Sequence, residues 1–316
     1  MSSADGALRA AAAVGPYFTW EPWPAGGPSR PVADPAGGGW RPFADLTDGE
    51  VVAERVDAAR HALVSMFGLA EDAVPPRVVA SVTFLGLASR LLSPPLGALV
   101  LAGTLPTPGP DQLWWKPVAG GPCPFAYGTI AGVPGDGASL VATIVTDLVA
   151  PVLRAFQERF VLSPQVLWGN VASALAGAAG VLADAHPDNP VASAGDGTID
   201  RAAVNDRDAI GAIGAIGVAD RDRIGLAGAA DRDAIDRAGV AERAGDIVAQ
   251  ALSLPPLAGT GTLVRPDPGC PRRFLVRHNC CLYYRIPGGG TCADCVLTPE
   301  PARRGHWQSV LAARTT

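Results

Sequence analysis

The sequence predicts a mainly α-helical protein with a few short strands, in which a helical body is followed by a cysteine-rich C-terminal segment. Three observations support this fold class. Helix-capping signals precede stretches of helical periodicity, a long apolar stretch occupies 78–105, and glycine, proline and tryptophan concentrate between the periodic stretches. The chain has 316 residues, 48% of them hydrophobic and 17% charged, which suffices to bury a sizeable core.

Residues 1–46 are rich in glycine, proline and tryptophan, which predicts an irregular N-terminal arm. Helical signals begin at the sequence Thr47-Asp48-Gly49-Glu50, which is typical of a capping box with the Thr47 side chain as the N-cap. Apolar residues then recur at helical spacing as far as Gly68, which favours the end of a helix.

The apolar stretch 78–105 is interrupted by Arg90 and by the pair Pro94-Pro95. Because a membrane span needs about 20 uninterrupted apolar residues, we expect two buried helices here, one over 76–92 and one opened by Ser93 and Pro94. The first residues also lack the pattern of a secretory signal. We therefore expect a cytoplasmic protein with reduced thiols and no stable membrane insertion.

The rest of the body reads as short strands within 111–128, then helices over 140–162, after Ser163-Pro164 and over 240–252. Repeated Asp-Arg-Asp-Ala-Ile units without a fixed period mark 190–246 as a low-complexity insert, disordered or partly helical, with an interaction arm as the alternative. We place a mainly helical domain at 47–255 and the cysteine-rich segment at 256–316.

Four cysteines of the C-terminal segment have the spacing of a metal site: Cys280, Cys281, Cys292 and Cys295. The Cys-x-x-Cys end lets two thiolates reach one metal from a tight turn, and the glycines of 287–290 allow backbone amides to approach the sulfurs. Neighbouring cysteines chelate a single zinc awkwardly, so the adjacent pair favours an iron–sulfur cluster. Structural zinc and a disulfide or unliganded thiols remain open at this point.

The remaining candidate ligands are less informative. Cys123 lies between two prolines and is expected to be a packed small hydrophobe. Cys270 is close in sequence to the four cysteines and could have a spare-ligand or redox role. His278 could replace a cysteine as a ligand, as in Rieske centres, but four cysteines are already present.

The string Cys280-Cys281-Leu282-Tyr283-Tyr284-Arg285, followed by Cys292-x-x-Cys295, resembles the C-terminal signature of the FhuF-like ferric siderophore reductases. The sequence Leu167-Trp168-Gly169-Asn170 is similar to a helix motif of the same family. Val296 and Asn279 depart from the proline and serine that are common in the family at these places. The resemblance implies a 2Fe-2S cluster on the four cysteines and one-electron reduction of a ferric siderophore, which releases ferrous iron.

Such a reaction needs an electron donor. The sequence has no GxGxxG motif that opens a βαβ unit, so we expect an external donor, a ferredoxin-like protein or a reductase. The alternative function is an iron–sulfur or zinc-binding sensor or structural protein without reductase activity.

The charge of the chain limits the classes of partner that it could bind. The net charge of −5 and the pI near 5.4 argue against nucleic acid as the main partner. The C-terminal tail is basic, however, and could attract an anionic siderophore or an acidic donor. Equally, its arginines could solvate the surface or offset the charge of thiolates. The candidate substrate- or donor-binding residues are Arg272, Arg273, Arg277, Arg285, Tyr283 and Tyr284, although the two tyrosines are expected mainly to pack around the cluster.

Overall fold

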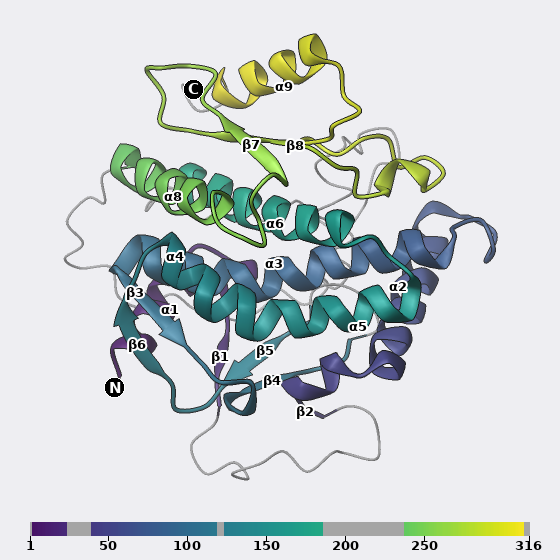
Figure 1. Cartoon of the computed structure of the whole chain (residues 1–316), viewed down its shortest axis with the longest axis horizontal. Helices are drawn as coiled ribbons and strands as arrows, with labels where there is room; N and C mark the ends of the chain where they lie inside the picture. Colours follow the sequence, from purple (N-terminus) through teal and green to yellow (C-terminus); the bar gives the residue numbers. More distant parts are fainter. Residues whose placement is uncertain (1, 24–38, 119–122, 186–236, 313–316) are drawn as a thin grey trace.

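The computed structural model describes residues 2–23, 39–118, 123–185 and 237–312 (Figure 1). It is mainly helical with several short sheets, so the predicted fold class is confirmed. The predicted insert lies outside the described residues up to 236, and the domain boundaries stay predictions. The helices are α1 Ser3–Ala12, α2 Gly49–Phe67, α3 Pro76–Ala102, α4 Gly137–Leu140, α5 Ala150–Phe160, α6 Pro164–Asp184, α8 Arg237–Leu252 and α9 Glu300–Ala312.

A π-helical stretch, Val141–Val149, joins α4 to α5, so that Gly137–Phe160 forms one helical rod. The strands form a four-stranded sheet in the order β1-β5-β4-β2 and two antiparallel two-stranded sheets, β3–β6 and β7–β8. Their bounds are β1 Glu21–Pro22, β2 Arg41–Pro42, β3 Thr104–Thr107, β4 Leu113–Trp115, β5 Phe125–Tyr127, β6 Ala131–Pro134, β7 Gly261–Val264 and β8 Phe274–Arg277.

Helix α3 is the centre of the core. It crosses the middle of the molecule in Figure 1 and packs against α1, α2, α5, α6 and α8. The small sheet and α1 lie on one side of it, while α6, α8 and the β7–β8 pair with α9 lie on the other. The C-terminal segment therefore rests on α6 and α8, two helices that are themselves supported by the core.

The prediction of two helices over 76–105 is wrong, because α3 runs through Pro94 and Pro95 without ending. A proline inside a helix leaves the carbonyl four residues earlier without its N–H partner. Here the indole Nε1 of Trp20 donates to the carbonyl of Arg90, at 3.1 Å, and replaces the donor that Pro94 lacks. The buried Arg90 side chain in turn donates to Thr19 O and Cys123 O, which holds the N-terminal segment against the helix.

The N-terminal arm is not wholly irregular either, because residues 3–12 form α1. Ser2 caps this helix and forms a capping box with Asp5, and alanine and leucine bury one face at helical spacing. The start of α2 also differs from the prediction. Asp48 is its N-cap and accepts from the Glu50 amide at 2.7 Å, whereas the Thr47 hydroxyl donates to Ala44 O.

The other helix signals are confirmed. Gly68 ends α2 in the left-handed region, Ser163 caps α6, and α8 covers the predicted 240–252. Short strands β4 and β5 lie within 111–128 as expected.

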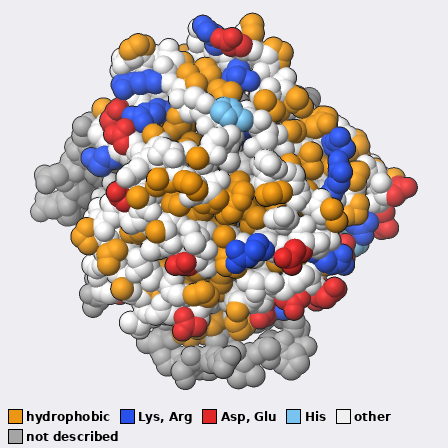
Figure 2. All heavy atoms as spheres, in the orientation of Figure 1, with side chains coloured by type: hydrophobic (Ala, Val, Ile, Leu, Met, Phe, Trp, Pro, Cys, Tyr) orange, Lys and Arg blue, Asp and Glu red, His pale blue; other side chains and the backbone are white. Residues whose placement is uncertain are grey.

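Among the described residues, three helical stretches are long and apolar enough to cross a membrane by length and composition: α3, Gly137–Phe160 and α6. In this fold they are packed inside the protein, with 83%, 56% and 61% of their most apolar windows buried. On the face shown in Figure 2, apolar side chains spread across the middle of the molecule and charged ones lie mostly toward the rim.

The contact between α1 and α3 can be tested at Gly97. A Cβ there would lie 2.8 Å from Phe18 Cδ1 and 3.0 Å from Ala11 Cβ, whereas a Cβ at Gly86, in the same helix, would meet nothing within 4 Å. We expect Gly97→Ala to lower the free energy of unfolding by about 1–3 kcal/mol through overpacking. Gly86→Ala should raise it by about 0.5–1 kcal/mol through helix propensity. Urea unfolding measures both, and equal effects would contradict the close packing of α1 on α3.

Candidate metal centre

The cysteine-rich loop, residues 278–299, follows β8 and folds back onto it. The Arg277 amide donates to Asp294 O at 3.0 Å, and the His278 amide donates to Thr260 O at 3.0 Å. Helix α9 then closes the segment, with Trp307 stacked on Phe274 of β8. The loop is therefore fixed between the β7–β8 pair, α9 and the helical body, although it contains little regular structure.

The structure brings the four predicted cysteines together. Cys281, Cys292 and Cys295 are 1%, 3% and 2% exposed, and Cys280 is half-buried. The Sγ atoms of Cys281 and Cys292 lie 3.7 Å apart, and further thiol contacts join Cys280 to Cys281 and Cys292 to Cys295. Four thiols, three of them buried and one half-buried, thus form one group.

Hydrogen bonds divide this group into two easily ionised sulfurs and two that hold protons. Bonds with the thiols of Cys280 and then Cys292, together with the positive charge of Arg277, lower the pKa of Cys281 to about 2. A bond with the Cys292 thiol lowers the pKa of Cys295 to about 6. The same bonds raise the pKa of Cys280 and of Cys292. Since only thiolates bind metal, the site is partly prepared for it.

Backbone amides also stabilise the sulfurs. The Leu282 amide donates to Cys280 Sγ at 3.2 Å and the Leu297 amide to Cys295 Sγ at 3.4 Å. The sequence led us to expect that amides of the glycine run would approach the sulfurs. Among the described residues, Leu282 and Leu297 donate to sulfur instead. Leu282 has a φ of 71°, a left-handed conformation that costs a non-glycine residue roughly 1–2 kcal/mol. Gly288 and Gly290 have φ values of 80° and 65°, which explains why glycine stands there.

A buried polar network links the loop to the helical body. Arg277 is fully buried, and its Nη2 donates to Asn170 Oδ1 of α6 at 2.8 Å and to Asn279 Oδ1 at 3.1 Å. Asn170 donates to the carbonyl and hydroxyl of Ser81 in α3, and the Ser81 hydroxyl donates to Cys281 O at 2.8 Å. Three segments far apart in sequence therefore meet directly behind Cys281.

The motif Trp168-Gly169-Asn170, noted in the sequence, is part of this network. Asn170 supplies the hydrogen bonds just described, and Gly169 leaves the space that the Asn279 side chain fills. Sequence reasoning missed Ser81, because a lone serine in an apolar helix carries no recognisable signal. It also could not pair Ser173 with Asp294, although the two side chains are hydrogen-bonded.

The donor set fits an iron–sulfur cluster. Four thiolates are the ligands of 2Fe-2S clusters, and amide donors to sulfur are usual around them. The Nη1 of Arg277 is buried and has no hydrogen-bond partner among the described residues, so the fully buried cation lacks a compensating group next to the thiols. In the described part of the chain no three His, Cys, Asp or Glu side chains converge on one point that could hold a single metal ion, and this includes the four cysteines.

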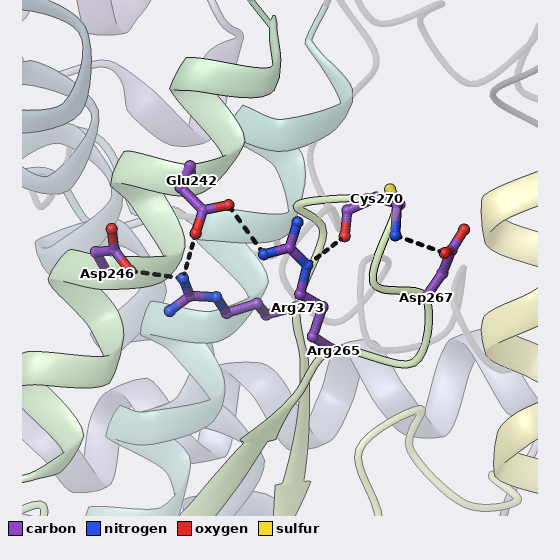
Figure 3. Close-up of polar contacts among 7 residues, drawn as sticks. Glu242, Asp246, Arg265, Asp267, Cys270 and Arg273 are labelled. Atoms are coloured by element: carbon purple, nitrogen blue, oxygen red, sulfur yellow. Dashed lines mark hydrogen bonds and ion pairs between the residues drawn. The ribbon is translucent and has the colours of Figure 1, made fainter.

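Two of the predicted substrate- or donor-binding arginines form ion pairs with helices. Arg272 is mostly buried, with its Nη1 2.5 Å from Asp184 Oδ2. Arg273 binds Glu242 and Asp246 of α8, at 2.9 and 2.5 Å, and Arg265 binds the other oxygen of Glu242 (Figure 3). These contacts fasten the connection between β7 and β8 to the helical body.

The other predicted contact residues divide into buried and exposed ones. Tyr283 is buried at the core, as its expected packing role requires. Tyr284 is 42% exposed, and the guanidinium of Arg285 lies 5.7 Å from the centre of its ring. Val296 and Leu297 of the same loop are also exposed, and we refer to these four exposed side chains, three apolar or aromatic and one positively charged, as the exposed edge of the loop.

The remaining candidate ligands are His278, Cys123 and Cys270. Both ring nitrogens of His278 contact other groups, Thr262 Oγ1 and Gly259 O, at 2.9 Å each. Cys123 is buried in the helical body, and burial raises the pKa of its thiol. Cys270 lies in the connection between β7 and β8, where its carbonyl accepts from Arg265 Nε at 2.8 Å (Figure 3).

Comparison with known proteins agrees with the geometry. Residues 277–297 match the family model described as the FhuF 2Fe-2S C-terminal domain. The match is short, but it spans all four clustered cysteines and the buried Arg277, and it confirms the resemblance seen in the sequence. No curated protein matches the chain. Residues 277–297 are therefore similar to the FhuF 2Fe-2S C-terminal domain, and they lie in the segment that packs on the helical body.

The junction between the loop and α6 can be tested at Gly169. A Cβ there would lie 2.6 Å from Asn279 Cγ and 2.7 Å from its Nδ2, whereas a Cβ at Gly177 of the same helix would meet nothing within 4 Å. We expect Gly169→Ala to displace Asn279 and to lower the free energy of unfolding by about 1–3 kcal/mol. It should also reduce the iron bound per chain after anaerobic reconstitution. Gly177→Ala should retain both, and a loss of iron in both variants would contradict this role of Gly169.

Proposed function

We propose that this protein is a cytoplasmic ferric siderophore reductase, in which Cys280, Cys281, Cys292 and Cys295 bind a 2Fe-2S cluster. The observation that carries the proposal is the group of four thiols, three of them buried, within a stretch that matches the FhuF 2Fe-2S C-terminal domain. When bound, such a cluster accepts one electron and passes it on. The cytoplasmic location is part of this proposal and rests on the expectation of reduced thiols from the cysteine pattern of the sequence.

The residues of the chain would provide a dry, preorganised site. Cys281 and Cys295 ionise readily, and the amides of Leu282 and Leu297 are already directed at sulfur. Little rearrangement is then needed when charge on the sulfurs changes, which favours rapid electron transfer. Burial of three of the four thiols also keeps water away from the site.

The substrate would approach the exposed edge formed by Tyr284, Arg285, Val296 and Leu297. Ferric siderophores hold iron with hard, anionic oxygens, and a positive charge at this edge would attract the anionic members of this class. One electron converts the bound Fe(III) to Fe(II), which the oxygens hold less strongly. The electron would come from an external donor, a ferredoxin-like protein or a reductase.

A second function remains a specific alternative: an iron–sulfur or zinc-binding sensor or structural protein. The network that joins the cysteine loop to α3 and α6 supports this function as much as it supports catalysis. Binding of a metal at the cysteines would change the loop, and the network would transmit that change to the helices. The two functions differ in whether the reduced protein reduces a ferric chelate.

Serine substitution tests the cluster and the reaction together. We expect Cys281→Ser, made in the most buried of the four cysteines, to lose most of the iron and acid-labile sulfide and the EPR signal of the dithionite-reduced protein. Reduction of a ferric siderophore by the reduced protein, followed with a ferrous-iron chelator, should fall to the uncatalysed rate. Cys270→Ser is the matched control and should retain iron and activity.

The outcomes of that experiment separate the candidates. Wild-type protein that binds the cluster but reduces no ferric chelate would favour the sensor or structural function. Colourless protein with stoichiometric zinc after anaerobic reconstitution would rule out the iron–sulfur proposal altogether.

The exposed edge is tested by charge reversal at Arg285. We expect Arg285→Glu to raise KM for an anionic ferric siderophore about three- to tenfold at low ionic strength, with a smaller effect as salt is added. KM for a neutral or cationic chelate should change little. Arg154→Glu, the same change at an exposed position on α5, is the control. Equal effects of the two variants would assign the attraction to net charge rather than to this edge.

A further inference from the structure

Arg277 has surroundings that are unusual for a charged side chain. It is fully buried, yet its hydrogen-bond partners are neutral: the side-chain oxygens of Asn170 and Asn279 and the carbonyl of Asn279, which accepts from Nε at 3.2 Å. No carboxylate in the described residues forms an ion pair with it. Burying a cation without an anion is strongly unfavourable, so a negative charge is expected beside it.

Arg272 shows how the same segment treats a buried arginine that has a structural task. It is nearly as buried as Arg277, but Asp184 lies 2.5 Å from its guanidinium and offsets its charge. The fold thus supplies a carboxylate to Arg272, whereas no carboxylate in the described residues forms an ion pair with Arg277.

The hydrogen bonds of Arg277 hold it beside the cysteines. Its guanidinium donates to the backbone and side-chain oxygens of Asn279, the residue before Cys280, and its backbone amide donates to Asp294 O, between Cys292 and Cys295. The Nη1 group has no hydrogen-bond partner among the residues that the structure describes. Asn170 and Asn279 fix the Nη2 group, so the charge is held in one place rather than on a mobile side chain.

We propose that Arg277 is a positioning residue that sets the reduction potential of the centre, with its fixed positive charge stabilising the reduced state. This inference rests on the proposed cluster, and it concerns the potential rather than the substrate. Adding an electron makes the centre more negative by one charge. In a buried site a nearby cation stabilises the more negative state more than it would in water, and this raises the potential.

Potentiometric titration of the reconstituted full-length protein, followed by EPR, tests the inference. We expect Arg277→Gln to lower the ratio of reduced to oxidised centres at a fixed ambient potential at least tenfold, which corresponds to 59 mV for one electron. Arg277→Lys retains the charge and should lower this ratio much less. Arg272→Gln, a buried arginine whose charge is already offset, should change the ratio by less than about twofold.

Asn170→Asp provides a second test if Arg277→Gln does not bind the cluster. The isosteric carboxylate would lie at the position of Oδ1, 2.8 Å from Arg277 Nη2, and would neutralise the cation in place. It should lower the potential in the same direction. An unchanged potential in Arg277→Gln, or in Asn170→Asp where only that variant binds the cluster, would overturn the inference, as would an equal shift in Arg272→Gln.

The readout does not depend on any ferric chelate, so the two proposals fail separately. A shifted potential in a protein that reduces no ferric siderophore would support the inference and contradict the reductase function. A wild-type protein that binds no cluster would overturn both.

Discussion

The hydrogen-bonded chain from Arg277 through Asn170 to Ser81 is the contact on which the arrangement of this protein depends. A buried guanidinium needs acceptors, and here they come from α6 and from the residue that precedes the first cysteine. Ser81 extends the chain to α3, the helix at the centre of the core, and returns to the carbonyl of Cys281. A loop with little secondary structure thereby obtains a fixed position, because its polar groups are satisfied by helices that cannot move independently.

The arginines of the C-terminal segment have mostly structural tasks. Arg265 and Arg273 bind carboxylates of α8, Arg272 binds Asp184, and Arg304 binds Glu300 within α9. The excess of positive charge in this part of the sequence is therefore largely used within the protein or buried with Arg277. Arg285 differs from these arginines, because it is exposed in the cysteine-rich loop and no carboxylate among the described residues forms an ion pair with it. The net charge of the sequence segment overestimated how basic the surface is, because ion pairs between distant elements cannot be recognised in a sequence.

The sequence was sufficient to predict the helical fold class, most helix starts and the grouping of four cysteines, because capping residues and ligand spacing are local signals. It failed where a distant residue changes the local rule. Pro94 and Pro95 should have broken α3, but Trp20 supplies the missing hydrogen-bond donor from 70 positions away. Helix α1 was missed although Ser2 and Asp5 carry a capping box, since the glycine-rich stretch that follows dominated the composition. The roles of Ser81 and Arg277 follow only from tertiary contacts.

The bond between Ser81 and the Cys281 carbonyl has a consequence for the life of the protein in the cell. Anything bound to the thiols in the folded state alone stabilises that state by mass action, and the network passes this stabilisation to α3. Chains that remain empty would keep the unneutralised charge of Arg277 in their interior and would open more often. Proteases degrade such chains faster. The abundance of the protein would then depend on the supply of whatever the thiols bind.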